Sequence, residues 1–232
     1  MSAKFAAVAF DLDGTLYPNA SLQSRLLPFF ARNWRLLLAF DRARGLIRGE
    51  QERRPDLARP DFYDWQAELT AGFLGAAGLP VDASETKALI ERRIYRGLEP
   101  LFRKVRLFPH VVELLAELRL SGLKVGLLSD FPPEAKLENL GLAGAWDAAL
   151  CSERCGALKP SAVPFNALAE ALGREPGETL YVGNSAAYDA LGARRAGMKA
   201  ALVSLAPGSA KFRSSADFVF RDYRKLRDFV LN

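Results

Sequence analysis

The sequence predicts an α/β fold in which a doubly wound parallel sheet carries an inserted α-helical domain. Three observations lead to this prediction. From residue 105 to the C-terminus, short apolar runs alternate with amphipathic helical patterns, which is typical of right-handed βαβ units and a parallel sheet. An apolar run over residues 5–10 supplies a further strand. Residues 18–104 contain helical patterns without clear strand runs.

The first strand is expected over residues 5–10, because a short apolar run bounded by polar residues is typical of a buried parallel strand. It leads into Asp11 and Asp13, and then into Gly14, which permits a sharp turn that exposes backbone N–H groups. Carboxylates beside a core need a compensating cation or proton, and ligands bind at strand ends of open α/β sheets. The pattern indicates a metal-assisted site with one nucleophilic carboxylate and one acid/base.

The remaining elements of the sheet domain follow in alternation. Glycine, serine and proline residues mark the ends of its helical patterns. Strands are expected over residues 123–128, 146–150, 179–182, 199–205 and 217–220. Helices are expected over residues 109–120, 132–140, 161–172 and 186–196, with a final helix at the C-terminus.

The helical insert is expected to begin directly after the first strand and to end before the second. Helices are predicted over residues 22–43, 61–77 and 84–96, with Pro55 and Pro60 in a segment that breaks the pattern. The predicted division is a core domain of residues 1–17 and 105–232 and a cap domain of residues 18–104.

Composition is consistent with a globular protein of one or two domains, since 50% of the 232 residues are hydrophobic and 25% are charged. The two cysteines imply no disulfide framework, so a reducing cytoplasm is the expected location. The longest later apolar stretch, residues 26–40, is interrupted by Arg32 and Arg35, so no membrane span is expected.

The net charge of +5 lies entirely within residues 18–106. A solvated arginine-rich surface explains it best, steering of anionic substrates is the next interpretation, and nucleic-acid binding is the least favoured.

Four short motifs together resemble the haloacid dehalogenase-like (HAD) superfamily of phosphatases. The stretch from Asp11 to Thr15, Asp-Leu-Asp-Gly-Thr, resembles motif I of this superfamily. The other three motifs occur in the expected order: Ser129-Asp130 at a strand end, Lys159-Pro160 in a loop, and Gly183-Asn184-Ser185 followed by Asp189. The helical insert also resembles the C1 cap of these phosphatases.

The resemblance implies a role for each matching residue. Asp11 would attack phosphorus to form an aspartyl-phosphate, and Asp13 would protonate the leaving group and then deprotonate water. An acid at position 13 favours a phosphatase or phosphomutase over a dehalogenase, because a departing halide needs no proton. The Ser129 hydroxyl, the turn at Gly14 and the backbone N–H of Asp130 would contact the substrate, while Lys159 would neutralise negative charge.

Magnesium is the cofactor that the resemblance implies. Its expected ligands are Asp11, the backbone carbonyl of Asp13, Asn184 and Asp189, since Mg²⁺ prefers oxygen donors. The family usually has an aspartate where this chain has Asn184. A neutral amide removes one negative charge, so we expect weaker metal binding or a larger part for Asp189, directly or through water.

The favoured function is therefore a Mg²⁺-dependent phosphomonoesterase acting on a small phosphorylated metabolite. Sugar phosphates, phosphoglycolate and nucleoside monophosphates are the candidate substrates, and no cap residue selects among them. Two alternatives stay open at this point. One is a phosphomutase that uses the same aspartate pair, and the other is a non-catalytic HAD-like protein that binds phosphate or a partner.

Overall fold

A six-stranded parallel sheet forms the centre of the computed structural model, which describes residues 4–79, 81–204 and 214–232. The strand order is β3-β2-β1-β4-β5-β6, so the direction of winding reverses at β1. This is the predicted doubly wound fold. The strands are β1 (Ala7–Phe10), β2 (Lys124–Ser129), β3 (Ala148–Cys151), β4 (Thr179–Gly183), β5 (Lys199–Val203) and β6 (Phe218–Phe220).

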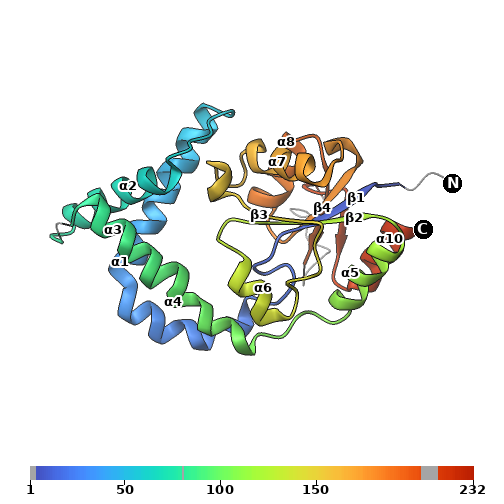
Figure 1. Ribbon diagram of the computed structural model, residues 1–232, viewed down its shortest axis with the longest axis horizontal. Helices are drawn as coiled ribbons and strands as arrows, with labels where there is room; N and C mark the ends of the chain where they lie inside the picture. Colours follow the sequence, from blue (N-terminus) through green and yellow to red (C-terminus); the bar gives the residue numbers. More distant parts are fainter. Residues whose placement is uncertain (1–3, 80, 205–213) are drawn as a thin grey trace.

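Alternate side chains of β1 build the two apolar layers of the core. Val8 and Phe10 face one layer, with the helices α5 (Val111–Leu120), α6 (Glu134–Leu140) and α10 (Tyr223–Leu231). Ala7 and Ala9 face the other, with α7 (Ala162–Leu172) and α8 (Leu191–Arg195). Figure 1 shows α7 and α8 above the sheet and α5 and α10 below it. Because β1 is buried on both faces, its position is fixed from both sides.

A group of helices stands apart from the sheet, at the left of Figure 1. Its members are α1 (Ala20–Arg53), α2 (Phe62–Ala76), α3 (Ala83–Leu89), the π-helical turn η1 (Ile90–Tyr95), α4 (Arg96–Leu98) and the 3₁₀ turn η2 (Glu99–Lys104). Its own apolar cluster includes Leu36, Phe40, Ala67, Leu74 and Ile94. The chain therefore inserts helices between β1 and β2, as the pattern predicted.

The largest difference from prediction lies in α1, which continues ten residues beyond the expected end at Ala43. Gly45 and Gly49 weaken the helical pattern there, since glycine disfavours a helix interior. Packing outweighs that preference, because the buried Ile47 lies against Phe62 and Leu158.

Smaller differences occur in the sheet domain. The helix predicted over residues 186–196 consists of a π-helical turn, η5 (Ala186–Ala190), followed by α8. The short 3₁₀ turns η3 (Glu153–Cys155) and η4 (Pro176–Glu178) were not predicted. The predicted end of the fifth strand at Leu205 lies outside the described residues. None of the described helices is long and apolar enough to cross a lipid bilayer.

Candidate active site

Asp11 follows β1 at the point where the strand order reverses. Phe10 pairs with Leu127 of β2 and with Val182 of β4. Asp11 therefore lies at the carboxyl end of β1, between the carboxyl ends of β2 and β4. Its backbone N–H donates to the Val182 carbonyl at 2.8 Å, and its side chain is almost fully buried. Reversal points are where ligands bind in such sheets, so the fold places this carboxylate at the expected crevice.

The Lys159 ammonium joins two of the predicted carboxylates. Its Nζ lies 2.6 Å from Asp11 Oδ1 and 2.8 Å from Asp189 Oδ1, and both pairs are buried. It also donates to the hydroxyl of Tyr181 at 3.3 Å, and that hydroxyl donates to the Leu128 carbonyl. The other oxygen of Asp11, Oδ2, accepts from the Thr15 hydroxyl at 2.7 Å. Residues 11, 159 and 189 thus meet, although up to 178 positions of sequence separate them.

Burial and charge act in opposite directions on this group. Desolvation raises the pKa of Asp11 to about 7, although Lys159 lowers it. Burial alone would lower the pKa of Lys159, but Asp11 and Asp189 outweigh it and raise that pKa. The ammonium is therefore charged at neutral pH, and added positive charge beside Asp11 would favour the ionised carboxylate.

Both oxygens of Asp189 have partners. Oδ1 faces Lys159, while Oδ2 accepts from the backbone N–H groups of Asn184 and Ser185 at 3.0 and 2.9 Å. Gly183 lies so close that a Cβ there would collide with the Asp189 side chain. Asp189 thus holds the loop after β4 and orients Lys159, and its predicted part in metal binding stays a prediction.

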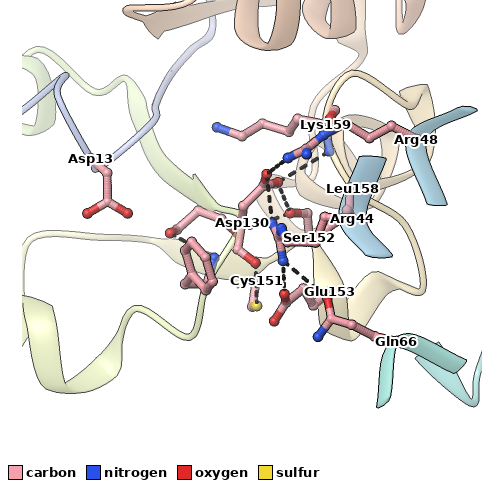
Figure 2. Close-up of polar contacts among 12 residues, drawn as sticks. Asp13, Arg44, Arg48, Gln66, Asp130, Cys151, Ser152, Glu153, Leu158 and Lys159 are labelled. Atoms are coloured by element: carbon pink, nitrogen blue, oxygen red, sulfur yellow. Dashed lines mark hydrogen bonds and ion pairs between the residues drawn. The ribbon is translucent and has the colours of Figure 1, made fainter. Parts of the chain in front are cut away.

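Asp13 lines the same crevice but has its own cation. Lys136 of α6 places Nζ 2.8 Å from Asp13 Oδ1 and 2.5 Å from Oδ2, and the Tyr17 hydroxyl also donates to Oδ1. The Lys136 ammonium lies against the rings of Phe102 and Phe131. In Figure 2, Asp13 lies apart from the group of side chains around Asp130.

Gly14 turns the chain with φ of +83°, a conformation that favours glycine. A Cβ at this position would collide with the side chains of Asn184 and Asn19. The absence of a side chain therefore lets Asn184 approach the motif I loop, where its Nδ2 lies 3.3 Å from the Asp13 carbonyl oxygen.

Ser129 is fully buried at the end of β2, and its hydroxyl accepts from the backbone N–H of Phe131 at 3.2 Å. Asp130, the next residue, directs its carboxylate toward a second group of charges. Arg44 and Arg48, one turn apart on α1, each donate to Asp130, and Arg44 also pairs with the buried Glu153. Figure 2 shows this cluster, in which Ser152 donates to the other oxygen of the Asp130 carboxylate.

A cavity of about 580 Å³ connects these groups. The predicted residues Asp11, Asp13, Asp130, Lys159, Asn184 and Asp189 line it, together with Arg44, Arg48 and Lys136. Gly14 and Ser129 are not among the described residues that line it. A second cavity of about 730 Å³ lies near Tyr63, Tyr95 and Arg154, and none of the predicted site residues lines it.

The sequence analysis missed several residues that contact the site, among them five with charged or hydroxyl side chains near the predicted carboxylates. Thr15 belongs to motif I, and Tyr17 follows it. Arg44 and Arg48 have the i, i+4 spacing of one helical face, but the predicted helix ended before them. Lys136 is buried beside Leu137 on α6, but this helix also carries the exposed Glu134 and Glu138, so no local pattern marks the lysine as a site residue.

Comparison with known proteins identifies the family. Residues 5–197 match the model for haloacid dehalogenase-like hydrolases. A phosphoglycolate phosphatase of Caulobacter vibrioides is 33% identical over 203 residues, covering 86% of this chain and 79% of the relative. A glyceraldehyde 3-phosphate phosphatase of Methanopyrus kandleri is 27% identical, covering 83% and 81%.

A solved structure agrees with these relatives. The HAD phosphatase from Thermococcus onnurineus is 27% identical, covers 96% of both chains and superposes with a TM-score of 0.61. The predicted superfamily, its phosphatase branch and the hydrolase class are thereby confirmed. With its motifs gathered at the reversal point of the sheet, the chain belongs to the haloacid dehalogenase-like hydrolases.

Proposed function

We propose that the protein is a cytoplasmic, Mg²⁺-dependent phosphomonoesterase that hydrolyses a small phosphorylated metabolite through an aspartyl-phosphate on Asp11. The observation that carries the proposal is the buried contact of Asp11 with Lys159, 2.6 Å long, beside a cavity that Asp13 also lines. An ammonium fixed there can offset the charge of a phosphoryl group while the carboxylate attacks it.

The proposed reaction has two steps. An oxygen of Asp11 forms a bond to phosphorus as the ester P–O bond breaks, and the leaving oxygen takes a proton from Asp13. Water then attacks phosphorus, gives its proton to Asp13 and releases phosphate and the free Asp11 carboxylate. Thr15 fixes the second oxygen of Asp11 throughout, and Asp189 keeps Lys159 directed at the site.

The residues present fit a divalent cation of the hard, oxygen-seeking type. Asp11, the Asp13 carbonyl and the Asn184 amide lie on adjoining loops, and rotation of the amide can present its oxygen. Among the described residues, no three acidic, histidine or cysteine side chains form a metal cluster. We propose that these three groups hold Mg²⁺ with waters completing its shell, and that Asp189 takes part directly or through one of those waters. When bound, the ion would supply positive charge that favours ionised Asp11 and offsets phosphoryl charge.

The substrate is proposed to be small and anionic. The relatives named above act on phosphoglycolate and glyceraldehyde 3-phosphate. Arg44 and Arg48 of α1 line the cavity, where both pair with Asp130. We propose that residues 18–104 form a cap domain over a core of residues 1–17 and 105–232, so that the cap selects the leaving group and excludes water.

A panel assay tests this function. The purified protein is incubated with phosphoglycolate, glyceraldehyde 3-phosphate, sugar phosphates and nucleoside monophosphates, with Mg²⁺ or with a chelator, and phosphate release is measured. We expect Mg²⁺-dependent release from at least one ester and a loss of about 10⁴-fold or more in Asp11→Asn. Full hydrolysis by Asp11→Asn would contradict the nucleophile. An isomerised product would favour a phosphomutase, and phosphate binding without turnover would favour a binding protein.

A further inference from the structure

The Asp130 carboxylate has two oxygens with different kinds of partner. Oδ1 accepts from two groups of the sheet domain, Ser152 Oγ at 2.5 Å and the backbone N–H of Lys159 at 3.2 Å. Oδ2 accepts from Arg44 and Arg48 of α1, at 3.1 and 3.0 Å. Figure 2 shows these contacts converging on the one side chain. Asp130 thus connects helix α1 to the lysine that reaches Asp11.

Arg48 contacts both Asp130 and Lys159. Its Nε donates to the backbone carbonyl of Lys159 at 3.0 Å, while its Nη2 donates to Asp130. The N–H of Lys159 is held by Asp130 and its C=O by Arg48, so both polar backbone groups of this residue depend on one ion pair. A shift of α1 would therefore act on the backbone from which the Lys159 side chain extends.

The environment makes these contacts strong. The side chains of Arg44 and Asp130 are 5% and 16% exposed, so water screens the pair far less than it screens a surface ion pair. Glu153, itself buried, fixes Arg44 from a second direction and accepts from Tyr95 of η1. Three cap elements, α1, α2 and η1, therefore contribute to one network, because Gln66 of α2 contacts both Arg44 and Tyr95.

We propose that Asp130 is a positioning residue that couples the position of helix α1 to the placement of Lys159 beside Asp11. When Arg48 and Arg44 engage Oδ2, the Lys159 backbone is held and its ammonium is directed at the nucleophile. When α1 moves away, that restraint is lost. The inference rests on the proposed function, because the placement of Lys159 affects turnover only if Asp11 attacks the substrate.

Two variants remove the coupling from opposite ends. In Asp130→Asn, the amide oxygen can still accept from Ser152 and the Lys159 N–H, whereas the amide nitrogen cannot accept from the arginines. Arg48→Met removes the cation and its hydrogen bonds to Asp130 and to the Lys159 carbonyl, while keeping most of the side-chain length. Arg48→Lys restores a charge that can reach Asp130, and Lys87→Met breaks an exposed ion pair within the cap as a control for charge loss.

We expect kcat/KM to fall about 10- to 100-fold in Asp130→Asn and in Arg48→Met, mainly through kcat, because a misplaced Lys159 weakens stabilisation of the transition state. The double variant should be no worse than the poorer single variant, since both changes break one linkage. Arg48→Lys should recover part of the loss, and Lys87→Met should stay within about two-fold of the parent.

Hydrogen exchange gives a readout that needs no turnover. In both single variants, the backbone amides of residues 44–53 and of Lys159 should exchange faster than in the parent protein, whereas the amides of β5, which lie outside the network, should exchange at the parental rate. Three results would overturn the coupling. The losses of kcat/KM in the single variants could multiply in the double variant, the single variants could keep the parental kcat, or the exchange rates of these amides could stay unchanged. A parent protein without turnover, or an active Asp11→Asn, would instead overturn the proposed function and leave the exchange result to judge the coupling alone.

Discussion

Two buried clusters of carboxylates and cations meet at Lys159, and they are built differently. Asp11, Lys159 and Asp189 all come from the sheet domain: Asp11 directly follows β1, Lys159 lies in the loop before α7, and Asp189 lies in η5 after β4. In the other cluster, Asp130 and Glu153 come from the sheet domain, but their cations, Arg44 and Arg48, come from α1. The first cluster is fixed by the sheet, whereas the second depends on how the helical insert lies against it.

The difference explains what the sequence could and could not predict. Asp11 and Asp13 follow a recognisable strand at an edge of the sheet where ligands bind, so their place in a site was predictable from the pattern. The convergence of Lys159 and Asp189 with them was predicted by the resemblance of their motifs to those of the HAD superfamily. Arg44 and Arg48 were not found because Gly45 and Gly49 obscured the end of α1. Burial of Ile47 against Phe62 and Leu158 is a long-range contact that a local pattern cannot reveal.

Local motifs also left the detailed geometry open. The type of residue at positions 184 and 189 suggested two metal ligands. The structure gives both oxygens of Asp189 to Lys159 and to backbone N–H groups, which spacing along the chain does not disclose. Ser129 was assigned correctly to a strand end, yet its hydroxyl contacts the Phe131 backbone and it is not among the described residues lining the cavity.

The largest expected effect comes from breaking the first cluster. Lys159→Met leaves Asp11 and Asp189 buried without their shared cation, so we expect kcat to fall by about 10³-fold and the free energy of unfolding by about 3–5 kcal/mol. Urea denaturation and steady-state kinetics measure the two effects. Lys159→Arg serves as the charge-conserving control, and a Lys159→Met protein with parental kcat would contradict the assigned role.

The proposed metal site offers the next test. Asn184→Asp adds a carboxylate beside the Asp13 carbonyl, so the Mg²⁺ concentration that gives half-maximal activity should fall about ten-fold. Asp189→Asn should lower kcat with little change in that concentration if Asp189 acts mainly on Lys159. A large rise in the Mg²⁺ requirement of Asp189→Asn would instead indicate that Asp189 is a direct ligand.

The second cluster should respond to pH. Burial raises the pKa of Glu153 from 4.5 to about 7, although Arg44 opposes the shift. The folded protein therefore binds this proton more tightly than the unfolded chain does, and Glu153 makes stability fall as the pH rises from about 4.5 to about 7. Without metal, the raised pKa of Asp11 also makes stability fall as the pH rises. The pH dependence of stability is therefore compared between the parent protein and Glu153→Gln, because the difference between them is due to Glu153 alone.

Chemical denaturation of the metal-free proteins at several pH values measures this difference. Glu153→Gln should lose less stability than the parent between pH 5 and pH 7.5, values chosen at roughly the two ends of the titration. Asp130 does not titrate between these pH values, because Arg44, Lys159 and Arg48 outweigh its burial and lower its pKa to about 2. Parallel pH profiles for the two proteins would show that Glu153 does not titrate in this range.

The smallest effect on stability is expected at an exposed ion pair between helix α1 and the sheet domain. Arg195 of α8 pairs with Glu52 of α1 at 2.6 Å, but the side chains are 32% and 61% exposed. Arg195→Met should change the free energy of unfolding by less than about 1 kcal/mol, because water and salt screen the pair. If Arg195→Met lost more stability than Arg44→Met, the expectation that the buried ion pair contributes more than the exposed one would be wrong.

The pairing of charges around the cavity has a thermodynamic consequence. Each of the four cations among its described lining residues already faces a carboxylate: Lys159 with Asp11 and Asp189, Lys136 with Asp13, and Arg44 and Arg48 with Asp130. An incoming dianion must either draw a cation from its partner or enter together with new positive charge. Affinities for the anion and for a divalent ion are then reciprocally linked, each raising the other by the same factor. Selectivity would in that case arise from joint occupancy rather than from attraction by a preformed positive pocket.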